Sequence, residues 1–156
     1  MGRKQGRIGK VTARYHQRVR RLGAALQVGL KGVLILEGAA TETEVTVTNL
    51  AKEGIPAPVA IVGIPGGLEV RHDQLKELVK SGKIDAYEVK GREVILYWRE
   101  MKPAQQVRLP LSLVAAVPGT YTAPASRAYL YYTDEFKDWV VGPQMTITTR
   151  AEGAGN

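Results

Sequence analysis

The stretch EVRHDQLKELVKSGKIDAYEVKGREVILYW, residues 69–98, places one amphipathic helix directly before a β-hairpin. In its first half, three apolar residues fall on a single helical stripe: Leu75, Leu78 and Val79. Glu69 and Asp73 suit the positive N-terminal end of such a helix, and Gly82 can adopt the left-handed conformation that ends it. The pattern therefore predicts a short helix over residues 69–81.

Most of the sequence outside this helix consists of short runs in which apolar and polar residues alternate. Residues 84–89 and 93–98 flank Lys90-Gly91-Arg92, whose central glycine suits a tight hairpin connection. Val45 and Val47 alternate with threonines, which predicts a strand with one buried face. Four more strands are expected: residues 58–64, 107–113, 125–133 and 145–149. Strands at this spacing with only one helix predict an all-β fold, an antiparallel β-sandwich.

Proline and glycine limit where these strands can pair. Pro110 lacks a backbone N–H, so its strand is restricted to a sheet edge or a bulge. Pro65-Gly66-Gly67 predicts a turn after the strand at residues 58–64. This glycine-rich turn precedes a helix but lacks the spacing of a phosphate-binding loop. We therefore expect a structural turn there.

Charge is distributed unevenly along the 156 residues. Nine of the 22 Lys and Arg residues lie in residues 1–31, which contain no acid, whereas the other thirteen are balanced by fifteen Asp and Glu residues. We expect residues 1–31 to form a basic N-terminal arm, residues 32–150 the β-sandwich domain, and residues 151–156 a disordered tail.

The arm is expected to be flexible or partly helical, because several apolar residues recur at helical spacing: Val19, Leu22, Ala25, Leu26 and Leu30. It could also belong to a longer parent chain. An alternative function for the protein, binding nucleic acid or another anionic surface, would use eight basic residues of the arm. These are Arg3, Lys4, Arg7, Lys10, Arg14, Arg18, Arg20 and Arg21.

Few residues of the sequence could carry catalysis or bind a metal. There is no cysteine, which excludes a thiolate nucleophile, a thiolate metal site and an internal thioester within this chain. The two histidines, His16 and His72, are far apart, and no serine lies in a nucleophile-elbow motif. The acidic group Asp134, Glu135 and Asp138 lacks calcium-loop spacing and is expected in a solvated loop. We expect a non-catalytic interaction module without cofactor or metal.

Five segments, taken in order, resemble one known family. They read IPGGL at residues 64–68, DQLKELVK at 73–80, YEV at 87–89, VILY at 94–97 and YYTDEF at 131–136. Over roughly residues 33–149, the sequence resembles the C-terminal receptor-binding domain of alpha-2-macroglobulin and other thioester-containing proteins, and it looks closest to the bacterial macroglobulins. The resemblance implies a sandwich with a single crossing α-helix.

The resemblance also implies a role in protein contacts, since such domains end large protease-trapping chains. The implied partner is a receptor or a neighbouring domain of a parent macroglobulin. No membrane insertion is expected, and the implied location is extracellular or periplasmic, although the sequence shows no signal peptide. In animal members the helix presents two lysines one turn apart; His72 stands at the first of these positions and Lys76 at the second. The candidate partner-binding face comprises Arg71, His72, Lys76 and Lys80.

Overall fold

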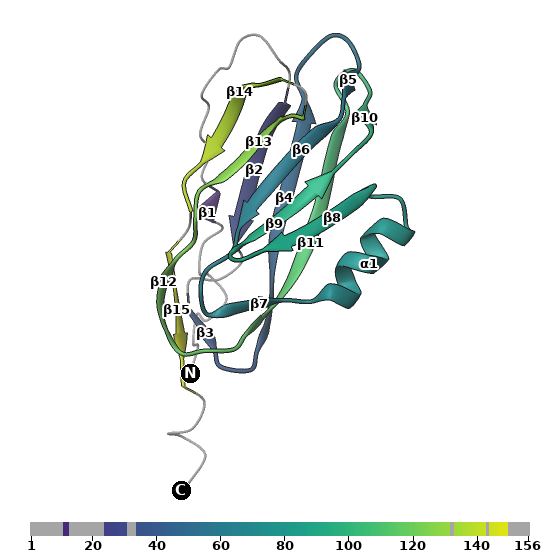
Figure 1. Ribbon diagram of the computed structural model, residues 1–156. Helices are drawn as coiled ribbons and strands as arrows, with labels where there is room; N and C mark the ends of the chain where they lie inside the picture. Colours follow the sequence, from purple (N-terminus) through teal and green to yellow (C-terminus); the bar gives the residue numbers. More distant parts are fainter. Residues whose placement is uncertain (1–10, 13–23, 31–33, 132, 143, 150–156) are drawn as a thin grey trace, which may run out of the picture.

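The computed structural model describes residues 11–12, 24–30, 34–131, 133–142 and 144–149, which form two five-stranded sheets and two smaller ones (Figure 1). In spatial order, the first sheet contains β1 (Val11–Thr12), β2 (Ala24–Leu30), β4 (Ala40–Asn49), β11 (Gln106–Ala115) and β7 (Leu68–Val70). The second sheet contains β14 (Thr133–Val140), β13 (Ser126–Leu130), β6 (Pro58–Gly63), β9 (Glu93–Tyr97) and β8 (Ala86–Lys90). The smaller sheets are β12 (Gly119–Thr122) with β15 (Gln144–Thr148) and β3 (Leu34–Leu36), and β10 (Glu100–Met101) with β5 (Ile55–Pro56).

One apolar core fills the space between the two large sheets. β11 contributes to it on alternate residues, which are at most 1% exposed: Leu109, Leu111 and Leu113. β4 pairs with β11 so that Val45 lies opposite Leu109 in the same layer. Side chains of the second sheet close this core from the other side: Val62, Val94 and Leu96. Each such side chain stabilises the fold by about 1.5–3 kcal/mol through burial, and the predicted antiparallel β-sandwich is confirmed.

α1 (His72–Lys80) is the single helix among the described residues. It leaves β7, at the edge of the first sheet, and leads to β8, at the edge of the second (Figure 1). The expected crossing helix is therefore confirmed. In the part of the chain that the structure describes, no helix has the length and apolar character needed to cross a membrane.

β2 corrects the expected extent of the N-terminal arm. Residues 24–30, assigned to a flexible or partly helical arm, instead form a strand that pairs antiparallel with β4. Their sequence AALQVGL alternates apolar residues with Gln27 and Gly29, but the helical spacing of the leucines and alanines masked this period of two. β4 has a free edge for this strand because β11 occupies only its other side. The eight candidate basic residues of the arm, and the predicted tail at residues 151–156, lie outside the described residues.

α1 begins three residues later than the sequence pattern predicts. Residues 68–70 form β7, which pairs with β11 through Leu68 and Ala115 and through Val70 and Leu113. Glu69 therefore lies in a strand, and its expected place at the helix N-terminus is wrong. The ladder with β11 outweighs the weak helical preference of these residues.

β14 corrects a second local prediction, the solvated loop around Asp134, Glu135 and Asp138. These residues belong to a strand, Thr133–Val140, which pairs antiparallel with β13. β6 pairs with the other side of β13, so β14 provides the second neighbour of β13. The register shifts between Ala128 and Leu130, which indicates a bulge that sequence periodicity does not reveal.

The core predicts a large cost for shortening one of its central side chains. Leu111→Ala removes a fully buried side chain and should lower the free energy of unfolding by about 2–5 kcal/mol because it leaves a cavity. Urea denaturation followed by tryptophan fluorescence measures the loss. The matched control is Leu36→Ala, at a side chain that is 56% exposed, with an expected change within about 0.5 kcal/mol. Similar losses for the two variants would contradict this placement of the core.

Candidate interaction surface

Backbone geometry fixes where α1 ends. Gly82 adopts φ 78°, the left-handed conformation predicted from the sequence. Its amide donates to the Val79 carbonyl at 3.0 Å, and the Lys83 amide donates to the Leu78 carbonyl at 3.0 Å. These two bonds form a Schellman motif, which satisfies carbonyls that the last helical turn would leave unpaired. The chain then turns sharply toward β8.

The buried face of α1 joins the core between the two sheets. Leu75 is fully buried and Leu78 is 6% exposed, and both belong to the main apolar cluster. The indole of Trp98, which follows β9, donates from Nε1 to the Lys83 carbonyl at 2.8 Å. This bond holds the segment after the helix against the second sheet, so both the helix and its exit are anchored.

Gln74 attaches α1 to the open edge of β11. β7 pairs with β11 only at residues 113–115. Among the described residues, no strand pairs with the same side of β11 at Pro110 or Ser112. Gln74 Nε2 donates to the Pro110 carbonyl at 2.7 Å, and Gln74 Oε1 accepts from the Ser112 amide at 3.2 Å. One side-chain amide therefore takes the place of a neighbouring strand. The expectation that Pro110 restricts its strand to a sheet edge is corrected, because β11 lies between β4 and β7; the sheet tolerates the proline because the β7 side of β11 is open at Pro110.

The exposed side chains of α1 divide into a basic and an acidic stripe. His72, Lys76 and Lys80 recur every four residues and share one stripe, because an α-helix has about 3.6 residues per turn. All three are exposed. Asp73 and Glu77 are also exposed and form the adjacent stripe. We call His72, Lys76 and Lys80 the basic strip.

The basic strip starts at the end of the helix that lies beside β8. The ring centroid of His72 is 6.2 Å from that of Tyr87 on β8, with the two rings tilted at 44°. Gln74, on the opposite flank of the helix, contacts β11. The basic strip thus begins beside β8, and Lys76 and Lys80 follow it along the exposed surface of the helix, next to the acidic stripe.

Arg71 differs from the other candidate residues because an acid neutralises it locally. Its Nη2 lies 3.1 Å from Asp73 Oδ2. Desolvation is the largest influence on the pKa of Asp73 and raises it, but the Arg71 charge and the backbone amides of Gln74 and Asp73 together lower the pKa below its usual value of 3.8. The stabilising effect of this pair is therefore present above about pH 4 and is lost as the pH falls through the lowered pKa of the folded state.

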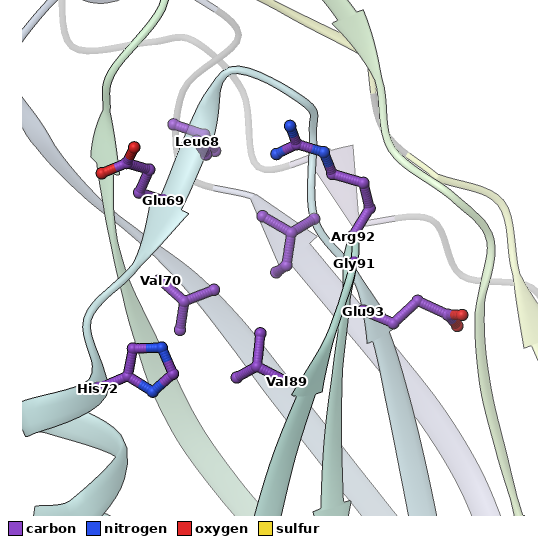
Figure 2. Close-up of a pocket in the computed structure, with 9 residues that line it drawn as sticks. Leu68, Glu69, Val70, His72, Val89, Gly91, Arg92 and Glu93 are labelled. Carbon is purple, nitrogen blue, oxygen red and sulfur yellow. The ribbon is translucent and has the colours of Figure 1, made fainter.

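A pocket of about 320 Å³ opens beside the N-terminal end of α1, between β7 and the hairpin formed by β8 and β9. Figure 2 shows Val70 and Val89 projecting toward each other across it, with His72 at one end and Arg92 at the other. Ile64 and Leu68, each 2% exposed, also line it. Gly91 adopts φ 55° in the turn that carries Arg92, as suits the first central position of a tight hairpin.

Three of the four candidate residues lie on α1, Arg71 is its N-cap residue, and the pocket adjoins them. Arg71, His72, Lys76 and Lys80 are all exposed, and His72 is shared by the basic strip and the pocket. Sequence patterns did not indicate the pocket, because Val70, Val89 and Arg92 come from the edges of two different sheets. Among the described residues, no three His, Asp or Glu side chains group closely enough to hold a metal ion. The arrangement is suited to binding a chain through charge and apolar contact.

A family model described as the A-macroglobulin receptor binding domain matches residues 58–139. A search of curated proteins found no match. Among solved structures, native alpha-2-macroglobulin from Escherichia coli, spanning domain MG7 to the C-terminus, is similar with a TM-score of 0.64 and 14% identity, over 80% of this chain and 23% of that one.

The Y1175G mutant of Salmonella alpha-2-macroglobulin is similar with a TM-score of 0.61 and 17% identity, over 81% of this chain and 9% of that one. The native conformation of the Escherichia coli protein gives a TM-score of 0.63 at 14% identity, over 81% of this chain and 9% of that one. The chain thus spans less than a quarter of the length of each of these three solved chains. These likenesses show a shared fold.

The two bonds made by Gln74 predict a measurable anchoring energy for the helix. Gln74→Ala leaves the Pro110 carbonyl and the Ser112 amide without this partner, and it should lower the free energy of unfolding by about 1–2 kcal/mol. Chemical denaturation gives the value. Glu77→Ala, at an exposed position of the same helix, is the control, with an expected change within about 0.5 kcal/mol. A Gln74→Ala loss no larger than that of the control would disprove the anchoring role.

Proposed function

The chain belongs to the family of A-macroglobulin receptor-binding domains, as the sequence resemblance suggested, and from this premise we propose that it is the interaction module of an alpha-2-macroglobulin-like protease inhibitor. It binds a protein partner, either a receptor or a neighbouring domain of a parent macroglobulin. The module itself catalyses no reaction. Because the sequence contains no cysteine, it forms no thioester of its own, and any covalent capture of a protease belongs to another part of the inhibitor.

The basic strip is the observation that carries this proposal. His72 and Lys76 occupy the positions at which the family resemblance expects the two helix lysines, and Lys80 extends the same stripe by one turn. The buried Leu75 and Leu78 fix the helix, so little order has to be gained on binding. Positive side chains held on a rigid element favour an acidic partner surface, which they attract and orient.

The proposed place of action is extracellular or periplasmic, in keeping with the family resemblance. A partner there meets the exposed face of α1, which lies beside the two sheets (Figure 1). Arg71 contributes less than the strip, since Asp73 is 3.1 Å from its guanidinium. The specific residues proposed for partner binding remain Arg71, His72, Lys76 and Lys80, with the larger effects assigned to Lys76 and Lys80.

Charge reversal on the basic strip should weaken binding to an acidic partner. The probe is a short capped peptide in which Asp and Glu residues flank a central glycine, titrated into the isotope-labelled full chain. Two-dimensional NMR spectra should show shifts in the amides of α1 and β8. Lys76→Glu combined with Lys80→Glu should weaken this site by about tenfold, because two attractions become repulsions.

The matched control for this titration is Lys52→Glu combined with Lys102→Glu. These two lysines are exposed and lie outside α1, so their reversal changes the net charge equally and leaves the basic strip intact. The control should bind the peptide at α1 like the unchanged protein. Peptide-induced shifts confined to the arm, or equal weakening by both double variants, would overturn the proposed function.

A second function, contact with nucleic acid or another anionic surface through the arm, is favoured by one observation: residues 1–31 hold nine bases and no acid. Replacing its eight candidate residues with glutamine should then abolish low-salt binding to duplex DNA, because fewer counterions would be released. Electrophoretic mobility shifts at several salt concentrations measure this. The Lys76→Glu and Lys80→Glu variant serves as the control and should retain DNA binding. Unchanged affinity after the glutamine replacements would exclude the arm as a DNA-binding element.

A further inference from the structure

The pocket and the basic strip form one continuous feature of the surface. His72 lines the pocket and begins the strip. From there, Lys76 and Lys80 continue along the helix, while the pocket extends the other way to Arg92 in the hairpin turn (Figure 2). A chain that follows the strip past His72 therefore passes over an apolar depression.

The walls of this depression are suited to an apolar side chain. Val70 and Val89 face each other across it and are half-buried, and Ile64 and Leu68 lie beneath the surface. Its volume of about 320 Å³ is at the lower end of the range for small-molecule sites. Aromatic side chains that enter such pockets commonly supply much of the affinity of a protein interface.

Two acids, Glu69 and Glu93, line the pocket beside Arg92 and His72. Glu93 lines the pocket but pairs with Arg127 at 2.8 Å. Figure 2 shows the carboxylates of Glu69 and Glu93 projecting away from the space between the two valines. Within the described residues, no carboxylate forms an ion pair with Arg92. Arg92 is therefore available at the end of the pocket opposite His72.

Resting on the proposed function, we infer that the partner segment is an acidic stretch with one bulky apolar residue, whose side chain inserts between Val70 and Val89. Carboxylates on one side of this residue meet Arg92, and those on the other side meet Lys76 and Lys80. The apolar side chain gives affinity and register, because surface ion pairs alone contribute little. The charges attract the segment and align it along the helix and across the pocket.

The test compares two peptides in the same NMR titration of the full chain. One is the acidic peptide with a central glycine, and the other replaces that glycine with phenylalanine. The phenylalanine peptide should bind about tenfold more tightly, since part of an aromatic side chain is buried. The methyl signals of Val70 and Val89 should shift with the phenylalanine peptide and stay unchanged with the glycine peptide.

Two variants separate the contribution of the apolar side chain from that of the charges. Val89→Phe fills the pocket and should remove the difference between the two peptides while the acidic binding at α1 persists. Arg92→Gln leaves the pocket open and should weaken both peptides, by about threefold. Because Val89→Phe could disturb the hairpin, the valine methyl shifts in the unchanged protein provide a readout without any substitution.

The outcomes separate this inference from the function on which it rests. If neither peptide binds at α1, the proposed function and the inference both fail. If both peptides bind equally at α1 and the valine methyl signals do not move, the function stands and the inference is overturned. A phenylalanine preference that survives Val89→Phe, with shifts at some other apolar surface, would also overturn it.

Discussion

Water must be excluded from the side of the sandwich where its two sheets end in short strands. β7 has three residues and β8 has five, and neither can cover the apolar layer between the sheets. Leu75 and Leu78 of α1 fill this opening. The helix is therefore part of the core, and every exposed feature of it is held in place by the need to keep these two side chains dry. Gln74 adds the hydrogen bonds that the edge of β11 would otherwise lack.

The pocket is the part of the same opening that the helix does not fill. β7 ends at Val70 and α1 begins at His72, so the helical side chains cover the opening only from that point onward. Val70 and Val89 are left partly exposed on facing edges. A longer helix starting at Glu69, as the sequence pattern suggests, would remove the pairing of β7 with β11 and with it one wall of the pocket. The recognition surface thus depends on where strand pairing stops and helix formation starts.

The sequence predicted those features that depend on local chemistry. Alternation placed Leu109, Leu111 and Leu113 on one buried face, and Gly82 was identified as the left-handed residue that ends the helix. The four-residue spacing of His72, Lys76 and Lys80 also placed these candidate residues on one exposed face of the helix. Long-range pairing was not predictable in this way: β2, β7 and β14 each form because a neighbouring strand offers a free edge. The pocket depends on two such edges meeting, so no local pattern indicates Arg92 or Val89.

The outer face of the second sheet influences the pocket through the ion pair between Arg127 and Glu93. Arg127 on β13 holds Glu93 on β9 at 2.8 Å, with about a quarter of the arginine side chain and a third of the glutamate side chain exposed. The Arg127 guanidinium also lies 5.4 Å from the centre of the Trp139 ring on β14, within the range of a cation–π contact. These contacts keep the Glu93 carboxylate turned away from the pocket. The charge at the Arg92 end of the pocket is therefore set partly by residues on three strands of the second sheet, and not by Arg92 alone.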